Sequence, residues 1–287
     1  MRRNRKADLF CRILTVLFLH VFVLIPAFSG VPARADEPRF SPSAMEGTAG
    51  EKVQLFAGQG FDAAQPMLFG VRMEMPEGWH TYWRNPGDSG IAPSFDWSES
   101  ENVKFIEVLW PVPQRFDAVG DTTFGYAREV VWPVLVQVDD PTKHVTVTLK
   151  MNYGVCSDIC VPGTYKQGLT MATGSALFPE IYFANRDIIQ PFLARVPRAL
   201  HDNEVLDIKA NSKALQVTLR GVTGGPQLIV EGPRGIRFAK PEQRRDGDLL
   251  LYQVPYRLTK GAGLKGQEVT LIFTGPDTAL EAIRKVQ

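Results

Sequence analysis

Hydrophobic and polar residues alternate along much of the chain after Glu51. Residues 71–75 (VRMEM) and 145–151 (VTVTLKM) show a period of two, which is typical of β-strands with one buried face. Clusters rich in Gly, Pro, Asn and Asp, such as residues 85–90, separate these stretches and predict turns. Because helical periodicity is scarce, the pattern predicts an all-β fold, an antiparallel sandwich or barrel, for residues 36–177.

The strand pattern resumes after residue 200. It predicts a second, smaller β-sandwich over residues 201–287, with five or six strands and no cysteine. Residues 178–200 are spaced more like a short helix, which Pro191 and Pro197 would interrupt. We expect this connector to pack against one of the domains. The strand segments predicted in the second domain are 205–210, 214–221, 227–231, 249–258 and 268–274.

The N-terminus has the features of a secretory signal. Four basic residues among the first six precede an apolar run over residues 13–28, and Ala33-Arg34-Ala35 supplies the small residues that signal peptidase recognises. The run is shorter than the roughly 20 residues of a membrane-spanning helix. We therefore predict a cleaved signal peptide over residues 1–35 and a periplasmic protein, with a retained membrane anchor as the alternative. Cleavage would also remove Cys11.

The charge balance argues against a polyanionic partner. The chain has 32 basic and 31 acidic residues; residues 1–35 hold six of the basic and one of the acidic ones, so the mature chain would carry a net charge of −4. Without a basic stripe, this composition excludes nucleic acid as an expected ligand. The remaining residues suffice for two hydrophobic cores of domain size.

Two cysteines, Cys156 and Cys160, remain after the leader, in a compartment where disulfides form. In one extended strand their Cα atoms would lie about 13 Å apart, whereas a disulfide needs them within about 7 Å. A bridge between them therefore requires the chain to reverse at residues 157–159. Cys156 would end one strand and Cys160 would begin the next.

The spacing alone leaves three interpretations of this pair: a structural disulfide, a redox pair or a metal site. As a staple the bridge is weak, because the chain-entropy gain is about 2 kcal/mol for so small a loop and about 5 kcal/mol for a loop of roughly 100 residues. A bridge across so tight a turn is also expected to be strained and readily reduced. Met73, Met75, Met151 and His80 would complete a soft ligand set for Cu(I), although the methionines more simply face the core.

Three blocks of the sequence resemble a known family. YGVCSDICVPG (153–163), GWHTYWRNPGDSG (78–90) and GDTTFGYAREVVWPV (120–134) are similar to the periplasmic N-terminal domain of the DsbD-type protein-disulfide reductases, most of all to their copper-tolerance branch, ScsB. The resemblance covers roughly residues 40–175. It implies an immunoglobulin-like sandwich with the two cysteines on adjacent strands.

The resemblance also implies a chemistry. Cys156 and Cys160 would cycle between disulfide and dithiol through a mixed disulfide, with Cys160 as the partner-facing thiol. Electrons would come from a membrane-embedded thiol-disulfide transporter and pass to thioredoxin-like periplasmic proteins, without a cofactor. The sequence lacks the membrane domain and the CxxC thioredoxin domain of full-length reductases, so we expect it to depend on a separate membrane partner.

Members of this family cover the cysteines with an aromatic cap. The resemblance places Phe124 as the cap, supported by Asp121 and Tyr126, with the turn given by Gly125. The alternative for Phe124 is an ordinary buried strand residue. Two threonines precede it where the DsbD branch has an acidic residue, so proton transfer through a carboxylate at that position is not expected.

The aromatic block supplies the remaining candidates. Trp79, Tyr82 and Trp83 could line a partner-binding surface, although aromatic residues beside a turn more often pack in the core. His80 could act as a base near the thiols or be a structural histidine. Two other functions remain alternatives: a non-enzymatic adaptor with a permanent disulfide, and a copper-tolerance protein that binds Cu(I).

Overall fold

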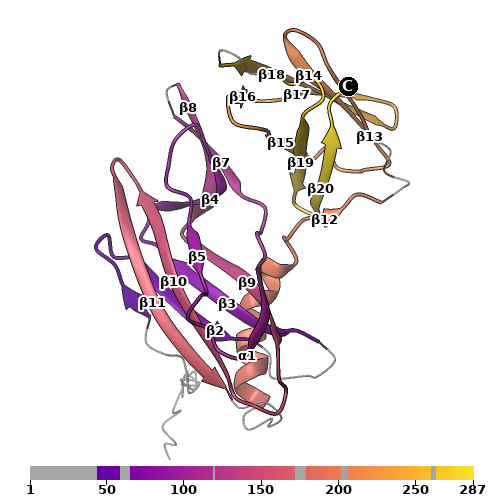
Figure 1. The fold of residues 1–287 in the computed structure, drawn as a ribbon. Coiled ribbons are helices and arrows are strands. Elements are labelled where there is room, and N and C mark those ends of the chain that lie inside the picture. The colour runs from indigo at the N-terminus through magenta and orange to yellow at the C-terminus, as the bar shows by residue number, and fades with distance from the viewer. Residues whose placement is uncertain are drawn as a thin grey trace, which may run out of the picture. The chain divides into compact units, whose positions relative to one another are not determined.

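The structure is a computed structural model. The predicted signal peptide, with Cys11, lies outside the residues that it describes. Phe40–Gln287 form one unit, in which two β-sandwiches follow each other along the chain with a helix between them in sequence (Figure 1). No helix in the described part of the chain has the length and apolarity needed to cross a membrane. The described residues are 44–58, 65–118, 120–171, 179–201, 204, 206–259 and 263–287.

The first sandwich consists of two sheets whose strand pairs are all antiparallel. Both segments with the clearest alternation, in β3 and β10, are strands, and the predicted all-β fold is confirmed. The first sheet has the order β1 (Met45–Glu46), β2 (Lys52–Ala57), β3 (Met67–Glu74), β9 (Glu129–Val138) and β6 (Val103–Val108). The second has the order β11 (Cys160–Met171), β10 (Val145–Cys156), β4 (His80–Gly87), β8 (Asp121–Ala127) and β7 (Gln114–Ala118), with β5 (Ser94–Asp96) paired to β10.

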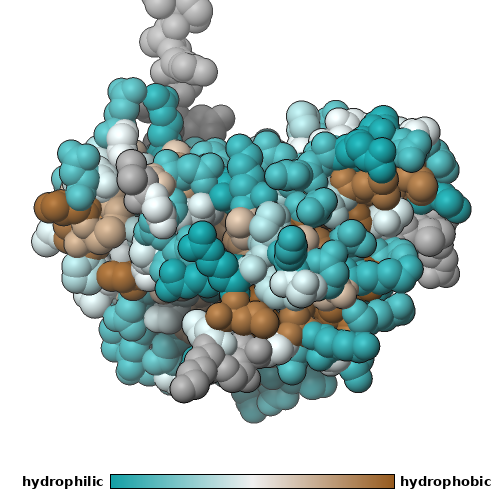
Figure 2. Space-filling view, turned by 90° about the horizontal axis from the view of Figure 1, so that it is seen from above, coloured by the Kyte–Doolittle hydropathy of each residue, from teal (hydrophilic) through white to brown (hydrophobic). Residues whose placement is uncertain are grey.

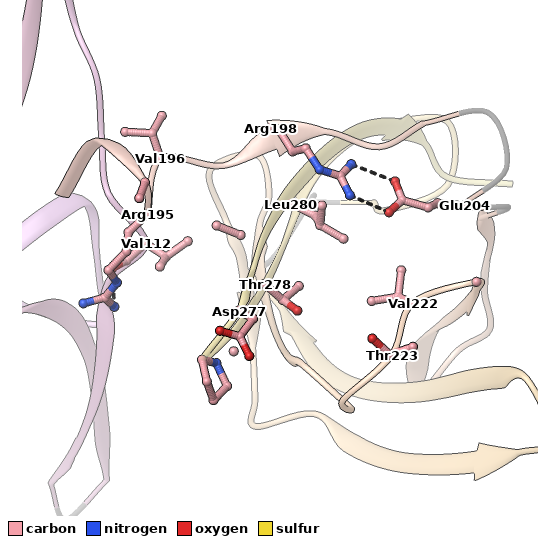
Figure 3. A pocket seen from close by; sticks show the side chains of 15 residues that line it. Val112, Arg195, Val196, Arg198, Glu204, Val222, Thr223, Asp277, Thr278 and Leu280 are labelled. Carbon is pink, nitrogen blue, oxygen red and sulfur yellow. Dashed lines mark hydrogen bonds and ion pairs between the residues drawn. The ribbon is translucent and has the colours of Figure 1, made fainter. Parts of the chain in front are cut away.

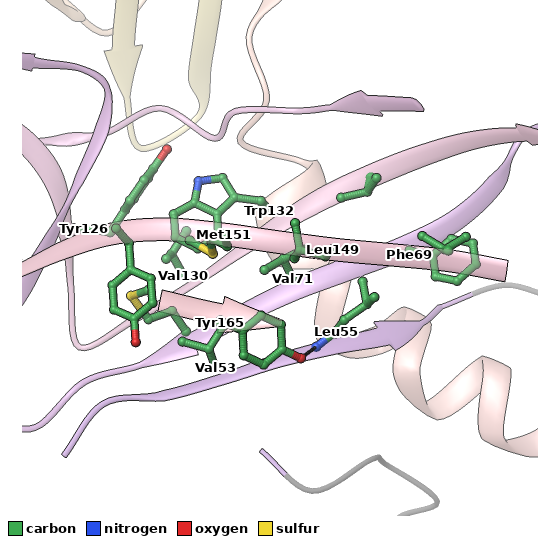
Figure 4. Packing of buried hydrophobic residues seen from close by; sticks show 14 of the residues in the cluster. Val53, Leu55, Phe69, Val71, Tyr126, Val130, Trp132, Leu149, Met151 and Tyr165 are labelled. Atoms are coloured by element: carbon green, nitrogen blue, oxygen red, sulfur yellow. Dashed lines mark hydrogen bonds between the residues drawn. The ribbon is translucent and has the colours of Figure 1, made fainter. Parts of the chain in front are cut away.

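Alternation along the strands builds the core between these sheets (Figure 4). In β10 every odd residue from Val145 to Val155 is buried, whereas the even residues up to position 152 are half-buried or exposed. Trp132 of β9 is fully buried, and its ring lies edge-on to those of Phe95, Trp110 and Tyr126, with centroids 5.5 to 6.2 Å apart. Such aromatic pairs stabilise the fold beyond their buried area.

The helix α1 (Pro179–Leu193) covers the outer face of the first sheet, as expected of a connector that packs against one domain. Its Ile189 is fully buried and packs with Phe56, Leu68 and Val131 of the sheet. Pro191 lies inside the helix, so the prediction that it interrupts the helix is wrong. A proline in the last turn removes only one backbone hydrogen bond, and the helix can end just beyond it.

The second sandwich has its own core and also consists of two sheets. Its strand pairs are antiparallel except for the parallel pair β12–β20. The first sheet has the order β12 (Arg198–Ala199), β20 (Thr278–Lys285), β19 (Glu268–Gly275) and β15 (Gln227–Glu231). The second has the order β13 (Leu206–Ala210), β14 (Ala214–Arg220), β18 (Leu249–Leu258) and β16 (Ile236–Phe238), with β17 (Glu242–Asp246) paired to β18.

The second sandwich contains more strands than predicted. The five predicted segments correspond to β13, β14, β15, β18 and β19, whereas the short β12 and the strands β16, β17 and β20 are not among them. β20 (TALEAIRK) is rich in helix-forming residues, and its pairing with β19 along its whole length overrides that propensity. β17 (EQRRD) is entirely exposed and has no alternation to detect.

The contact between β4 and β8 gives a test of this packing. Gly125 of β8 pairs with Tyr82 of β4, and a Cβ on Gly125 would lie 1.9 Å from the carbonyl oxygen of Thr81. We expect Gly125→Ala to force the strands apart and to lower the free energy of unfolding by about 3 kcal/mol, measured by denaturant unfolding. Gly263→Ala, whose Cβ would meet nothing within 4 Å, is the control; equal losses in the two variants would contradict the prediction.

Candidate functional site

The two cysteines are joined at the end of the β10–β11 hairpin. β10 ends at Cys156 and β11 begins at Cys160, so the chain reverses at residues 157–159, as a bridge requires. The cysteines are direct cross-strand partners, with Cα atoms 4.1 Å apart, and form a disulfide. Within the turn, the N–H of Ser157 donates to the carbonyl oxygen of Ile159 at 3.1 Å.

The sequence after Cys160 fits this ladder despite its proline. A short Cα separation marks an antiparallel pair without backbone hydrogen bonds between its two residues. Because the two kinds of pair alternate, Gly154 and Pro162 form a pair of the same kind. Pro162 therefore stands where the ladder requires no N–H, and β11 can continue through it as the edge strand of the sheet.

The two sulfur-bearing residues differ in access. Cys156 is 2 % exposed, whereas Cys160 is exposed and follows Ile159, which is 67 % exposed. Ile91, 40 % exposed, lies against the hairpin, since a Cβ on Gly154 would come within 2.7 Å of its Cβ. Cys160 is therefore the more accessible residue of the pair, and Cys156 is shielded.

The hydroxyl of Tyr82 contacts both sulfurs. It donates a hydrogen bond to Sγ of Cys156 at 2.6 Å and lies 3.2 Å from Sγ of Cys160. The side chain is buried, and burial, followed by the negative charge of Asp121, raises the pKa of Tyr82 above its ordinary value. The hydroxyl therefore keeps its proton at neutral pH and remains a donor to sulfur.

The turn after β4 covers the ring of Tyr82. A Cβ on Gly90 would lie 2.3 Å from Cε1 of that ring, and its φ of 111° is one that glycine adopts readily. Asp88 fixes the turn to β8, because its N–H donates to the carbonyl oxygen of Thr122 at 2.8 Å and its carboxylate accepts from the N–H of Thr122 at 3.0 Å. The turn predicted at residues 85–90 therefore also shields the ring of Tyr82 from solvent.

His80 lies on the same face of the sheet. It is the cross-strand partner of Cys156, and its ring lies edge-on to Tyr82 at 5.4 Å and stacks on Phe116 at 4.6 Å. Burial lowers the pKa of His80 below its ordinary value, which favours the neutral imidazole at pH 7. Sequence reasoning missed Phe116, whose strand β7 (QRFDA) is too short and too polar for its alternation to stand out.

Phe124 does not cover the disulfide, and its predicted role as a cap is wrong. Tyr82 and Gly125 are paired directly and share one face of the sheet, so the neighbouring Phe124 points to the opposite face. There it packs against the core, with the guanidinium of Arg115 5.8 Å from its ring centroid. Gly125 lies within β8 and forms no turn; it is the close approach of Thr81 that favours glycine.

The two residues predicted to support the cap have other contacts. Tyr126 is buried, and its hydroxyl donates to the carbonyl oxygen of Pro111 at 2.7 Å, so it is a core residue. Asp121, at the start of β8, accepts a hydrogen bond from the hydroxyl of Ser89. It thereby helps to hold the turn that covers Tyr82.

The tryptophans of the aromatic block contribute to packing. Trp83 is 0 % exposed in the core of the first sandwich, so its prediction as a surface residue is wrong. Its position in β4 directs it inward, toward the opposite face from Tyr82. Trp79 is half-buried against the same core, and its part in partner binding stays a prediction.

The positions of the methionines do not fit the alternative of a Cu(I) ligand set. Met73 and Met151 are buried in the core, and Met75 is 8 % exposed. Met151 occupies an odd, inward position of β10, whereas Cys156 occupies an even position on the outer face. Among the described residues, no group of three or more His, Cys, Asp or Glu side chains could hold a metal ion.

A cavity of about 680 Å³ lies away from these residues (Figure 3). Its lining includes Val112, Arg195 and an ion pair between Arg198 and Glu204 at 2.7 Å, and none of the predicted site residues. The face seen in Figure 2 is mostly hydrophilic, with separate hydrophobic patches. Among the described residues, the Cys156–Cys160 disulfide is therefore the best-defined candidate for a reactive site.

Comparisons with known proteins confirm the resemblance in sequence. Residues 51–172 match the family model described as thiol:disulfide interchange protein DsbD, N-terminal, and residues 195–287 match a domain of unknown function, DUF8393. The crystal structure of the N-terminal periplasmic domain of ScsB from Proteus mirabilis is similar, with a TM-score of 0.64 and 22 % identity over 82 % of this chain and 93 % of that chain. No match was found among curated proteins. The predicted immunoglobulin-like fold is confirmed.

Tyr82→Phe tests the hydrogen bond to sulfur, because it removes only the hydroxyl. If an incoming thiolate attacks Cys160, Cys156 leaves as a thiolate, and a hydrogen bond to a charged group contributes about 1.5–3 kcal/mol. We expect the variant to react with dithiothreitol about tenfold more slowly and to show a raised pKa for Cys156 in the dithiol form, measured by stopped-flow and by thiol titration. Tyr126→Phe is the control, and equal rates for Tyr82→Phe and the unsubstituted protein would contradict the assignment.

Proposed function

We propose that the first sandwich is a thiol-disulfide exchange domain in which Cys156 and Cys160 are the redox pair. The match of residues 51–172 to the DsbD N-terminal family supports this chemistry. One observation carries it: the accessible Cys160 is bonded to the shielded Cys156, and the hydroxyl of Tyr82 lies within hydrogen-bond distance of both sulfurs.

Reduction begins at Cys160. A thiolate of a reducing partner attacks its Sγ, the Cys156–Cys160 bond breaks, and a mixed disulfide forms between the partner and Cys160. The electron pair of the broken bond goes to the sulfur of Cys156, which becomes a thiolate that accepts the hydrogen bond from Tyr82 and then takes a proton from solvent. A second thiolate of the partner attacks its own mixed-disulfide sulfur and releases Cys160, so two electrons have entered the pair.

Oxidation runs the same steps toward a substrate. The Cys160 thiolate attacks the disulfide of an oxidised protein, one thiolate of that protein leaves, and a mixed disulfide forms. The Cys156 thiolate then attacks the sulfur of Cys160, re-forms the intramolecular bond and releases the second thiolate of the substrate, which takes up a proton. Because Cys156 lies next to Cys160 across the hairpin, this resolving step needs no large backbone movement.

The assignment of partners rests on the resemblance to the DsbD-type family. We infer that the electron donor is a membrane-embedded thiol-disulfide transporter and that thioredoxin-like proteins accept the electrons, in the periplasm. The neighbour from Proteus mirabilis is described as a periplasmic domain, which supports this location, as does the basic and apolar N-terminal sequence. The pair itself supplies the redox chemistry, so the proposal requires no cofactor.

Single-cysteine variants test which thiol meets the partner. We expect reduced Cys156→Ala to form a stable mixed disulfide through Cys160 with an oxidised thioredoxin-like protein. Reduced Cys160→Ala should react at about one tenth of that rate or below, because a shielded thiol reacts poorly. Non-reducing electrophoresis measures both rates, and the double alanine variant is the blank.

Two outcomes would overturn the proposal. One is faster trapping through Cys156 than through Cys160. The other is a midpoint potential of the pair far below about −300 mV, the range of structural disulfides.

Removal of both sulfurs tests the structural alternative. Because the bridge closes a very small loop, we expect Cys156→Ser with Cys160→Ser to lower the free energy of unfolding by about 2 kcal/mol or less. Urea unfolding of oxidised, reduced and double-serine proteins gives this value. A loss well above about 5 kcal/mol, the upper end for a disulfide, would favour a structural staple.

A further inference from the structure

Arg84 connects the strand that carries Tyr82 to the second sandwich. It lies in β4, two residues after Tyr82, and its Nη2 lies 2.7 Å from Oε2 of Glu231 and 2.6 Å from Oε2 of Glu281. Glu231 belongs to β15 and Glu281 to β20. The guanidinium also lies 4.6 Å over the ring of Trp83. The ring therefore contacts the flat face of the guanidinium, and the two carboxylates bind its edge.

This ion triad is not an ordinary surface pair. The side chains of Arg84, Glu231 and Glu281 are 31 %, 17 % and 28 % exposed, so water screens their attraction only in part. An Arg that meets two carboxylates and an aromatic ring has little freedom to reorient. The longer contact between Arg237 and Asp88, at 3.8 Å with Arg237 69 % exposed, adds little by comparison.

The β4 ladder leaves a gap at the place where Arg84 sits. β4 pairs with β8 at Tyr82↔Gly125 and next at Gly87↔Thr123, so residues 83–86 bulge away from the regular register. A bulge loosens local pairing and redirects the side chains beside it. The positions on either side of this bulge are Tyr82 and the turn that covers its ring.

The bulge lines a cavity on this side. A cavity of about 510 Å³ adjoins the bulge and is lined by Arg84, Asp88 and Phe124 of the first sandwich and by Phe238 of the second, among other residues. The bulge is therefore held by Trp83 in the core, by the carboxylates that bind Arg84, and at its far end by the hydrogen bonds between Asp88 and Thr122.

We propose that the second sandwich, through Glu231 and Glu281, fixes Arg84 and thereby holds the Tyr82 hydroxyl on the sulfurs of the redox pair. Arg84 is then a positioning residue that acts through Tyr82. The proposal rests on the exchange function proposed above and assigns a role in it to the second sandwich. The expected consequence is slower release of the Cys156 thiolate when the triad is broken.

Arg84→Met tests this role in the full chain, because it keeps the length and apolar stem of the side chain and removes its charge. We expect reduction by dithiothreitol to slow by about fivefold or more, which is the smallest change typical of coupling between two sites. In a Tyr82→Phe background the same substitution should change the rate by less than about twofold, since the group through which it acts is absent. Thiol titration should show a raised pKa for Cys156 in Arg84→Met.

The chain offers a matched control in Arg72. Arg72 also meets two carboxylates, Glu74 at 2.8 Å and Glu129 at 2.6 Å, with a side chain 24 % exposed, but it lies in β3 of the other sheet. Arg72→Met should leave the rate unchanged.

If Arg84→Met folds poorly, Glu231→Gln with Glu281→Gln removes the charges from the second sandwich alone and should slow reduction in the same way.

The outcomes separate this proposal from the exchange function. Equal rates for Arg84→Met, Arg72→Met and the unsubstituted protein would overturn the positioning role while exchange itself persists. An equal slowing by Arg84→Met with and without the Tyr82 hydroxyl would also overturn it. A disulfide in the unsubstituted protein that resists dithiothreitol and has a structural potential would instead overturn the exchange function.

Discussion

The antiparallel register of β11, β10, β4 and β8 is the constraint on which the site depends. It pairs Cys160 with Cys156, Cys156 with His80, and Tyr82 with Gly125. Side chains of directly paired residues share one face of a sheet, so the two sulfurs, the imidazole and the phenol meet on the outer face. A shift of one residue in any of these strands would send its side chain into the core.

The same alternation gives the two cysteines unequal environments. Cys156 lies within the sheet beneath Tyr82, whereas Cys160 stands at the start of the edge strand β11 and is exposed. In the exchange that we propose, the sulfur of Cys160 is the one attacked, and the sulfur of Cys156 is the one that leaves and returns. The phenol of Tyr82 keeps its proton because burial raises its pKa, so it can stabilise the sulfur that takes the negative charge.

The structure also links the second sandwich to this chemistry. β4 is held in register at Tyr82 and again at Gly87, and the bulge between these positions directs Arg84 to Glu231 and Glu281. Ion pairs at partly exposed positions are weak individually, but here they act on a segment that the ladder leaves unpaired. The small free energy of these ion pairs can therefore fix the position of the Tyr82 hydroxyl. Its hydrogen bond to sulfur depends on distances of a few tenths of an ångström.

The sequence by itself determined the all-β architecture, the hairpin that a Cys156–Cys160 bridge requires and the family resemblance, because alternation and turn residues act locally. It did not determine that Phe124 faces the core while Tyr82 reaches the sulfurs, since either face of a strand can hold an aromatic residue. Nor did it indicate β20, whose residues favour a helix, or the partners of Arg84. These features depend on which strands pair, and in which register, between residues far apart in the chain, and only the tertiary structure decides that pairing.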